Sequence, residues 1–116
     1  MTAPLSKRTC TPCSGGDTPL TGEGLIQHLA QVDDRWSVVN EHHIEAEFRC
    51  GNFVKALGFT NAIGAVAEAE GHHPDICLGW GRVSVTIWTH AIDGLSVNDF
   101  ILAAKIDAAA DDETAS

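Results

Sequence analysis

Apolar and charged residues alternate strictly along one stretch of this chain, between positions 44 and 48. Every second residue there is apolar, and the residues between them are charged. This period of two predicts a strand with one buried side and one side in water. A shorter, largely apolar segment at 36–39 precedes it, and the chain is expected to turn around Asn40 and Glu41. We therefore expect an antiparallel hairpin.

A second pair of strands is expected at 76–78 and 82–89, joined by a glycine-rich turn. The later strand alternates over its whole length. One side of it should carry Val83, Val85, Ile87 and Thr89, and the other Ser84, Thr86, Trp88 and His90. His90 would then end the polar side of this strand, beside a predicted turn, where binding residues are often found.

Apolar residues three and four positions apart predict helices over about 22–32, 53–71 and 97–108. The residues expected to cap them are Thr21, Asn52 and a capping box at Ser96-Val97-Asn98-Asp99. The element order is then α-β-β-α-β-β-α. We predict an α+β fold, a four-stranded antiparallel sheet with three helices packed on one face.

The helix predicted at 53–71 is apolar over more than one stripe, so a second copy of the chain should cover part of it. One narrow line along this helix stays small or polar. It consists of Asn61, Gly64, Glu68 and His72, which follow at three- and four-residue steps. Pro74 disfavours helical geometry in the residue before it, so the helix should end near His72.

The two ends of the chain differ in composition from the rest. Residues 1–20 hold three of the four prolines and predict an irregular arm, and residues 110–116 predict an acidic, disordered tail. One folded domain remains between them, at 21–109. Cys10 and Cys13 form a Cys-x-x-Cys motif, which can be half of a zinc site or a redox pair. No second ligand pair follows and no strand precedes it, so we interpret it as part of a mobile or edge-packed arm.

The charge balance restricts the kinds of partner. Seven lysines and arginines are scattered among sixteen acidic residues, for a net charge of −9. This charge argues against nucleic acid, whose binding requires clustered basic residues. No apolar run approaches the eighteen or so residues of a membrane span, and no secretory signal is visible at the N-terminus. A cytoplasmic protein with reduced thiols is therefore expected.

His72 lies at the predicted end of a helix, where the helix dipole favours the protonated imidazole. Glu68, one turn earlier, can hold a ring nitrogen of His72 and favour the same charged form. An imidazole oriented by a carboxylate is common in general acid–base catalysis. The same spacing also occurs in a simple salt bridge that ends a helix, and spacing alone does not separate the two.

His73, kept extended by Pro74, must point away from His72, either into a pocket or into water. A metal site made of His72, His73 and His90 is not expected. Adjacent histidines rarely bind one ion well, and no carboxylate or thiolate completes the set at an obvious spacing.

Three further residues allow a structural interpretation. His42 and His43 lie in the predicted hairpin turn, where a solvated pair is expected. Asp99 occupies the third position of its helix, where a carboxylate stabilises the helix start without a catalytic role.

Several spaced residues resemble the signature of the pterin-4a-carbinolamine dehydratases, of the bacterial type. They are Glu68-x-x-x-His72-His73-Pro74, Trp80, Thr89-His90, Gly94-Leu95-Ser96 and Asp99, preceded by Trp36 and Phe53-x-x-Ala56-x-x-Phe59. The similarity spans about residues 21–108. The Cys-x-x-Cys also resembles one found in bacterial members.

The resemblance implies that the chain removes water from 4a-hydroxytetrahydropterin to give quinonoid dihydropterin, which recycles the cofactor of aromatic amino acid hydroxylases. No metal or other cofactor would be needed. His72 and His90 would act as acid and base, in an order that the sequence leaves open. His73 would mainly hold the substrate. The expected pterin contacts are His72, His73, Pro74, Thr89, His90, Ala91 and Ile92, and the expected orienting residues are Glu68 and Asp99.

The resemblance also implies partners. Family members are homodimers or homotetramers, and an aromatic amino acid hydroxylase is a further candidate partner. Because animal members also serve as dimerisation partners of a transcription factor, the alternative function is an interaction scaffold of the same fold. Gly71, Ile76, Ala91 and Ile92 depart from the residues of animal members. These departures concern how the pterin would be held, and they leave the three histidines in place.

Overall fold

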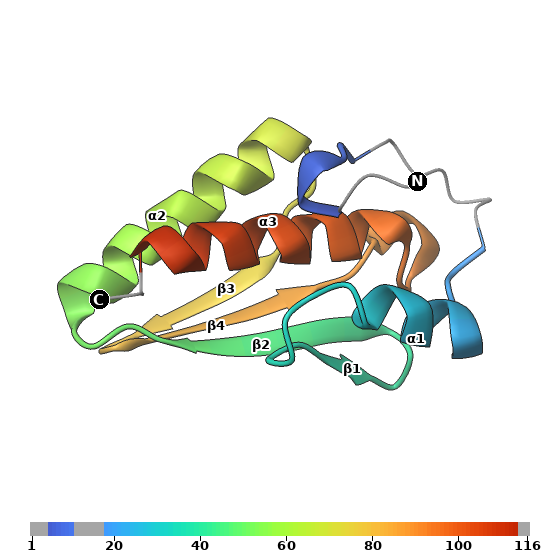
Figure 1. Ribbon diagram of the computed structural model, residues 1–116, viewed down its shortest axis with the longest axis horizontal. Coiled ribbons are helices and arrows are strands. Elements are labelled where there is room, and N and C mark those ends of the chain that lie inside the picture. The colour runs from blue at the N-terminus through green and yellow to red at the C-terminus, as the bar shows by residue number, and fades with distance from the viewer. Residues whose placement is uncertain (1–4, 11–17, 114–116) are drawn as a thin grey trace.

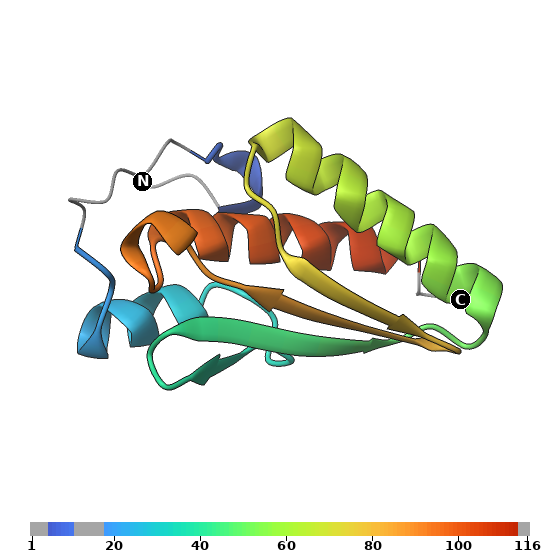
Figure 2. The same ribbon diagram turned by 180° about the vertical axis from the view of Figure 1, so that it is seen from behind.

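The computed structural model describes residues 5–10 and 18–113. The elements in chain order are η1 (Leu5–Lys7), α1 (Gly22–Leu29), β1 (Ser37–Val39), β2 (His43–Arg49), α2 (Phe53–Glu70), β3 (Asp75–Gly79), β4 (Arg82–Ile87), η2 (His90–Ile92) and α3 (Val97–Glu113). The four strands form one antiparallel sheet in the order β1-β2-β4-β3. Figures 1 and 2 show the helices over one face of this sheet, with α2 and α3 side by side. The predicted fold class is confirmed.

The alternation in the two central strands sets the register of the sheet. Ile44 pairs with Ile87, Ala46 with Val85 and Phe48 with Val83, so six apolar residues face the helices together. Phe59 of α2 packs on Phe48 with ring centroids 4.8 Å apart. A one-residue slip would move this whole set to the solvent face, so burial fixes the pairing.

Three predicted boundaries are wrong. The first helix, predicted to about 32, ends at Leu29. The chain leaves the sheet at Ile87, because Thr89 forms an isolated bridge with Gly94 and His90 begins the short helix η2. His90 therefore lies on a turn beyond the strand. The predicted tail at 110–116 is wrong for residues 110–113, which continue α3. Alanine favours helix, and Ala110 is buried, so packing extends the helix past 108. Residues 114–116 lie outside the described part.

Part of the predicted arm is packed against the domain. Leu5 is 2% exposed and belongs to the hydrophobic core, and Cys10 contacts both long helices. The edge-packed interpretation therefore holds for residues 5–10, whereas Cys13 lies outside the described residues. Within the described ranges, no helix is long and apolar enough to cross a membrane. The cytoplasmic location stays a prediction.

Gly71 ends α2 in the left-handed conformation, with φ of 65°. Its amide N–H and that of His72 satisfy carbonyl groups of the last helical turn, the usual use of glycine after a helix. Because a Cβ raises the energy of this conformation, Gly71→Ala should lower the free energy of unfolding by about 1 kcal/mol. Urea denaturation measures the change. An unchanged midpoint would contradict this role, and Gly71→Asn should lose less.

Candidate active site

A cavity of about 530 Å³ opens between the end of α2, the start of α3 and the segment after β4. Its lining residues are Cys10, Glu70, Gly71, His72, His73, Trp88, Thr89, His90, Ala91 and Asn98. The structure thus brings the three predicted histidines to one cavity, together with Thr89 and Ala91. Pro74 and Ile92 do not line it, and their contact with a pterin stays a prediction.

His72 is held by a buried carboxylate. Its Nε2 lies 2.6 Å from Oδ1 of Asp99, a side chain with no exposed surface. Since a carboxylate only accepts, the proton between them is on Nε2 of His72 when Asp99 is ionised. The other ring nitrogen, Nδ1, is then the atom that can exchange a proton. Asp99 therefore fixes both the orientation and the tautomer of this imidazole.

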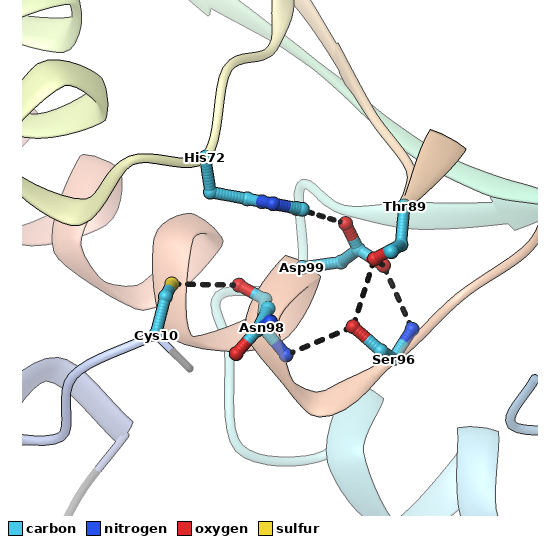
Figure 3. A network of polar contacts seen from close by, with 6 residues as sticks. All are labelled: Cys10, His72, Thr89, Ser96, Asn98 and Asp99. Carbon is cyan, nitrogen blue, oxygen red and sulfur yellow. Dashed lines mark hydrogen bonds and ion pairs between the residues drawn. The ribbon is translucent and has the colours of Figure 1, made fainter. Parts of the chain in front are cut away.

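A hydrogen-bond network holds Asp99 in turn (Figure 3). Its Oδ2 accepts from the Thr89 hydroxyl at 2.9 Å and from the Ser96 amide N–H at 2.8 Å. The Thr89 hydroxyl has only one proton, so at 2.8 Å the Ser96 hydroxyl donates to it. The Ser96 hydroxyl also accepts from the amide N–H of Asn98. The predicted capping box is thus present, and its carboxylate also holds His72.

The predicted pairing of Glu68 with His72 is wrong. Oε1 of Glu68 lies 2.9 Å from Nε2 of His73, and both side chains are largely exposed. The reason is that α2 ends at Glu70, and the left-handed Gly71 turns the chain out of the helical line. His72 therefore leaves the face that Glu68 occupies and reaches α3. An exposed ion pair of this kind contributes little to stability.

His90 lies on η2 and is exposed. Its ring stacks on that of Trp88, with centroids 4.4 Å apart and planes at 32°. The backbone of its turn is closed by hydrogen bonds between Thr89 and Gly94. Trp88 therefore supports one face of the imidazole, and the exposed side is open to a ligand in the cavity.

The sequence predicted a solvated pair at His42 and His43. In the structure both side chains have partners within the chain. Nε2 of His42 lies 2.7 Å from Oδ1 of Asp93, the residue that ends η2. The two histidines share a hydrogen bond of 3.1 Å, and both rings lie beside Trp88. The hairpin turn folds back onto the segment that carries His90, and this contact between distant segments has no signal in the local sequence.

Five lining residues were not predicted as site residues: Cys10, Glu70, Gly71, Trp88 and Asn98. Gly71 lines the cavity as the residue that ends α2. Trp88 precedes His90 by two positions, so the alternation placed both on one side, and this signal could have found it. Cys10, Glu70 and Asn98 meet only through contacts across 60 and 88 positions. Among residues 5–10 and 18–113, no three histidine, cysteine, aspartate or glutamate side chains come together as a metal site.

The arrangement can move protons. An oriented imidazole with a buried carboxylate partner can act as base or acid at near-neutral pH, and a second, exposed imidazole can take the complementary part. Both line the same cavity, so one small molecule can contact both.

Comparison with known proteins gives a consistent result. The family model described as pterin 4 alpha carbinolamine dehydratase matches residues 18–109. A relative from Rubrobacter xylanophilus is 52% identical over 89% of this chain and 95% of its own. Another, from Alkaliphilus metalliredigens, is 50% identical over 89% and 93%. Both carry the provisional name of pterin-4-alpha-carbinolamine dehydratase.

Two solved structures are also similar. A transcriptional coactivator/pterin dehydratase from Brucella melitensis has a TM-score of 0.75 at 31% identity, covering 80% of this chain and 99% of its own. A pterin dehydratase-like protein, described as a RuBisCO assembly factor in the alpha-carboxysome, has a TM-score of 0.57 at 25% identity, covering 65% and 88%.

Proposed function

The chain belongs to the pterin-4-alpha-carbinolamine dehydratase family, and from this premise we propose that it removes water from 4a-hydroxytetrahydropterin to give quinonoid dihydropterin. The observation that carries the proposal is the convergence of His72, His73 and His90 on one cavity. The reaction would recycle the pterin cofactor of aromatic amino acid hydroxylases, and it would need no metal or other cofactor.

The elimination breaks the bond between C4a and its hydroxyl oxygen, while a proton leaves N5. One group gives a proton to the leaving hydroxyl, which departs as water, and another takes the proton from N5. The electron pair of the N–H bond forms the new double bond to C4a. The net charge of protein and substrate together is therefore unchanged. Both catalytic groups need pKa values near the working pH.

We assign the two proton transfers to His72 and His90. His72 would use Nδ1, because Asp99 occupies its Nε2. His90 would use the ring edge that faces the cavity, with Trp88 behind it. His73, paired with Glu68 at the rim, would hold the substrate rather than exchange its protons. Thr89 contributes through Asp99, and Ala91 would contact the pterin directly.

The assay that tests the proposal follows the decay of 4a-carbinolamine in the presence of the purified protein. We expect decay faster than in buffer, with quinonoid dihydropterin as the product. General acid–base catalysis typically contributes 10²- to 10⁴-fold, so the acceleration should be well above the scatter of the assay. Decay at the buffer rate would overturn the proposal.

An apolar surface supports the proposal that the chain forms a homodimer or homotetramer. Phe53, Val54 and Leu57 at the start of α2 are 45%, 77% and 42% exposed, and Trp80 is 74% exposed. Gly81, next to Trp80, lies beside the segment that leads into α2, where the Cys50 amide N–H donates to its carbonyl oxygen. Exposed large apolar residues on neighbouring segments are typical of interaction surfaces.

The same surface is the observation that favours the second candidate function, an interaction scaffold. One similar structure is described as a transcriptional coactivator and another as an assembly factor. A scaffold would keep this surface and have no need of the network around Asp99. Catalysis needs this network, because it orients His72. The dehydratase is therefore the preferred proposal.

A further inference from the structure

A segment outside the matched family domain forms part of the wall of the catalytic cavity. Residues 5–10, which we call the N-terminal strap, precede the stretch 18–109 that the family model matches. Cys10 at the end of the strap nevertheless lines the cavity together with His72. In Figure 3 its thiol points to the carbonyl oxygen of Asn98, the residue directly before Asp99. The sulfur lies 3.6 Å from that oxygen.

Three anchors hold the strap in place. Leu5 is buried in the core. Nζ of Lys105, on α3, donates to the carbonyl oxygen of Ser6 at 3.1 Å. At the other end of the strap, the amide N–H of Cys10 donates to Oε1 of Glu70 at 2.8 Å. Both ends of the strap are thus held against the domain.

Glu70 ties the strap to the segment that carries the histidines. It is the last residue of α2, directly before Gly71 and His72. Its other oxygen lies 3.5 Å from Nζ of Lys105, and the side chain is only 11% exposed. The hydrogen bond from Cys10, with help from Lys105, holds the pKa of the Glu70 carboxyl below its usual range. An ionised Glu70 thus accepts from the strap and pairs with α3.

We propose that the N-terminal strap is a substrate-binding element that closes one side of the cavity and retains the pterin without taking part in proton transfer. This inference rests on the proposed dehydration. Burial, followed by the charge of Glu70, raises the pKa of the Cys10 thiol to about 12, so the thiol itself is uncharged. A neutral thiol beside the pterin can contact it without competing for its protons.

The test compares two variants that release the strap, Leu5→Ser and Glu70→Ala, with the intact chain. Each should raise the KM for the carbinolamine about five- to tenfold, the loss expected from one packing contact, and leave kcat nearly unchanged. Glu70→Gln keeps an acceptor for the Cys10 amide, so it should recover most of the affinity. Lys7→Ala is the matched control, because Lys7 lies in the strap but is exposed.

Alkylation of Cys10 by iodoacetamide provides a readout of docking that does not depend on activity. In a Cys13→Ser background, peptide mapping should show slow alkylation of Cys10 and fast alkylation of the exposed Cys77. Leu5→Ser and Glu70→Ala should speed the reaction at Cys10 and leave Cys77 unchanged.

The outcomes separate the two proposals. A raised KM together with faster alkylation of Cys10 supports the strap as a binding element. Faster alkylation with an unchanged KM, or a loss confined to kcat, overturns this inference and leaves the dehydratase in place. An intact chain that does not accelerate the decay overturns the proposed function and the strap's role with it.

Discussion

Replacing both His72 and His90 with alanine should return the decay of the carbinolamine to the buffer rate. Each histidine is assigned one of two proton transfers in the same elimination, so the loss of either should cost roughly 10²- to 10³-fold in kcat. The double variant should lose little more than the worse single variant, because residues that act as a unit are not additive. Initial rates of the four proteins, measured at saturating substrate, make the comparison.

Two control histidines sharpen this result. His73→Ala should raise KM more than it lowers kcat, because His73 is assigned to holding the substrate. His28 is bonded to Gly24 in α1 and does not line the cavity, so His28→Ala should keep the wild-type kcat. Full activity in the double variant would show that the proton transfers belong to other groups.

Replacing Asp99 with alanine should lower both stability and activity. The carboxylate is fully buried and has partners in His72, Thr89 and Ser96. Removing it leaves buried donors without an acceptor, which should lower the free energy of unfolding by about 3 kcal/mol. It also frees the His72 ring, so kcat should fall roughly 100-fold even where the variant is folded. Urea denaturation and the decay assay measure the two effects.

Two amide variants separate catalysis from stability. In Asp99→Asn, the amide oxygen can still accept from Thr89 and Ser96, and the NH₂ group then faces His72. The donor then faces Nε2 and favours the other tautomer, so kcat should fall more than stability. Asp107→Asn is the matched control. The Asp107 carboxylate accepts from the Trp36 ring N–H and the Asp33 amide N–H and does not line the cavity, so this variant should lower stability and keep kcat. Equal losses of kcat in both variants would contradict the role of Asp99.

The sheet could be predicted because its register and its burial follow the same alternation. Val83, Val85 and Ile87 are fully buried opposite the apolar residues of β2, as a period of two requires. Helix ends were less predictable. The tail after 108 looked polar in composition, yet Ala110 packs into the core and carries α3 onward.

The histidines of the site and the two orienting carboxylates could be predicted, but which carboxylate holds which histidine could not. A helical line predicted Glu68 beside His72, and one left-handed residue, Gly71, breaks that line. The actual partner, Asp99, is 27 positions away on another helix. Its position in the capping box was visible, but its second role depends on how α2 and α3 pack. The docking of Cys10 on Glu70 is equally a tertiary contact, across 60 positions.

The dependence of the decay rate on protein concentration is the decisive measurement for the proposed dehydration. The first-order rate constant for loss of 4a-carbinolamine should rise linearly with the concentration of the intact chain. It should stay at the buffer value for the His72→Ala, His90→Ala double variant at every concentration. A rate constant that does not rise with the concentration of the intact chain, or equal slopes for the two proteins, would contradict catalysis by His72 and His90.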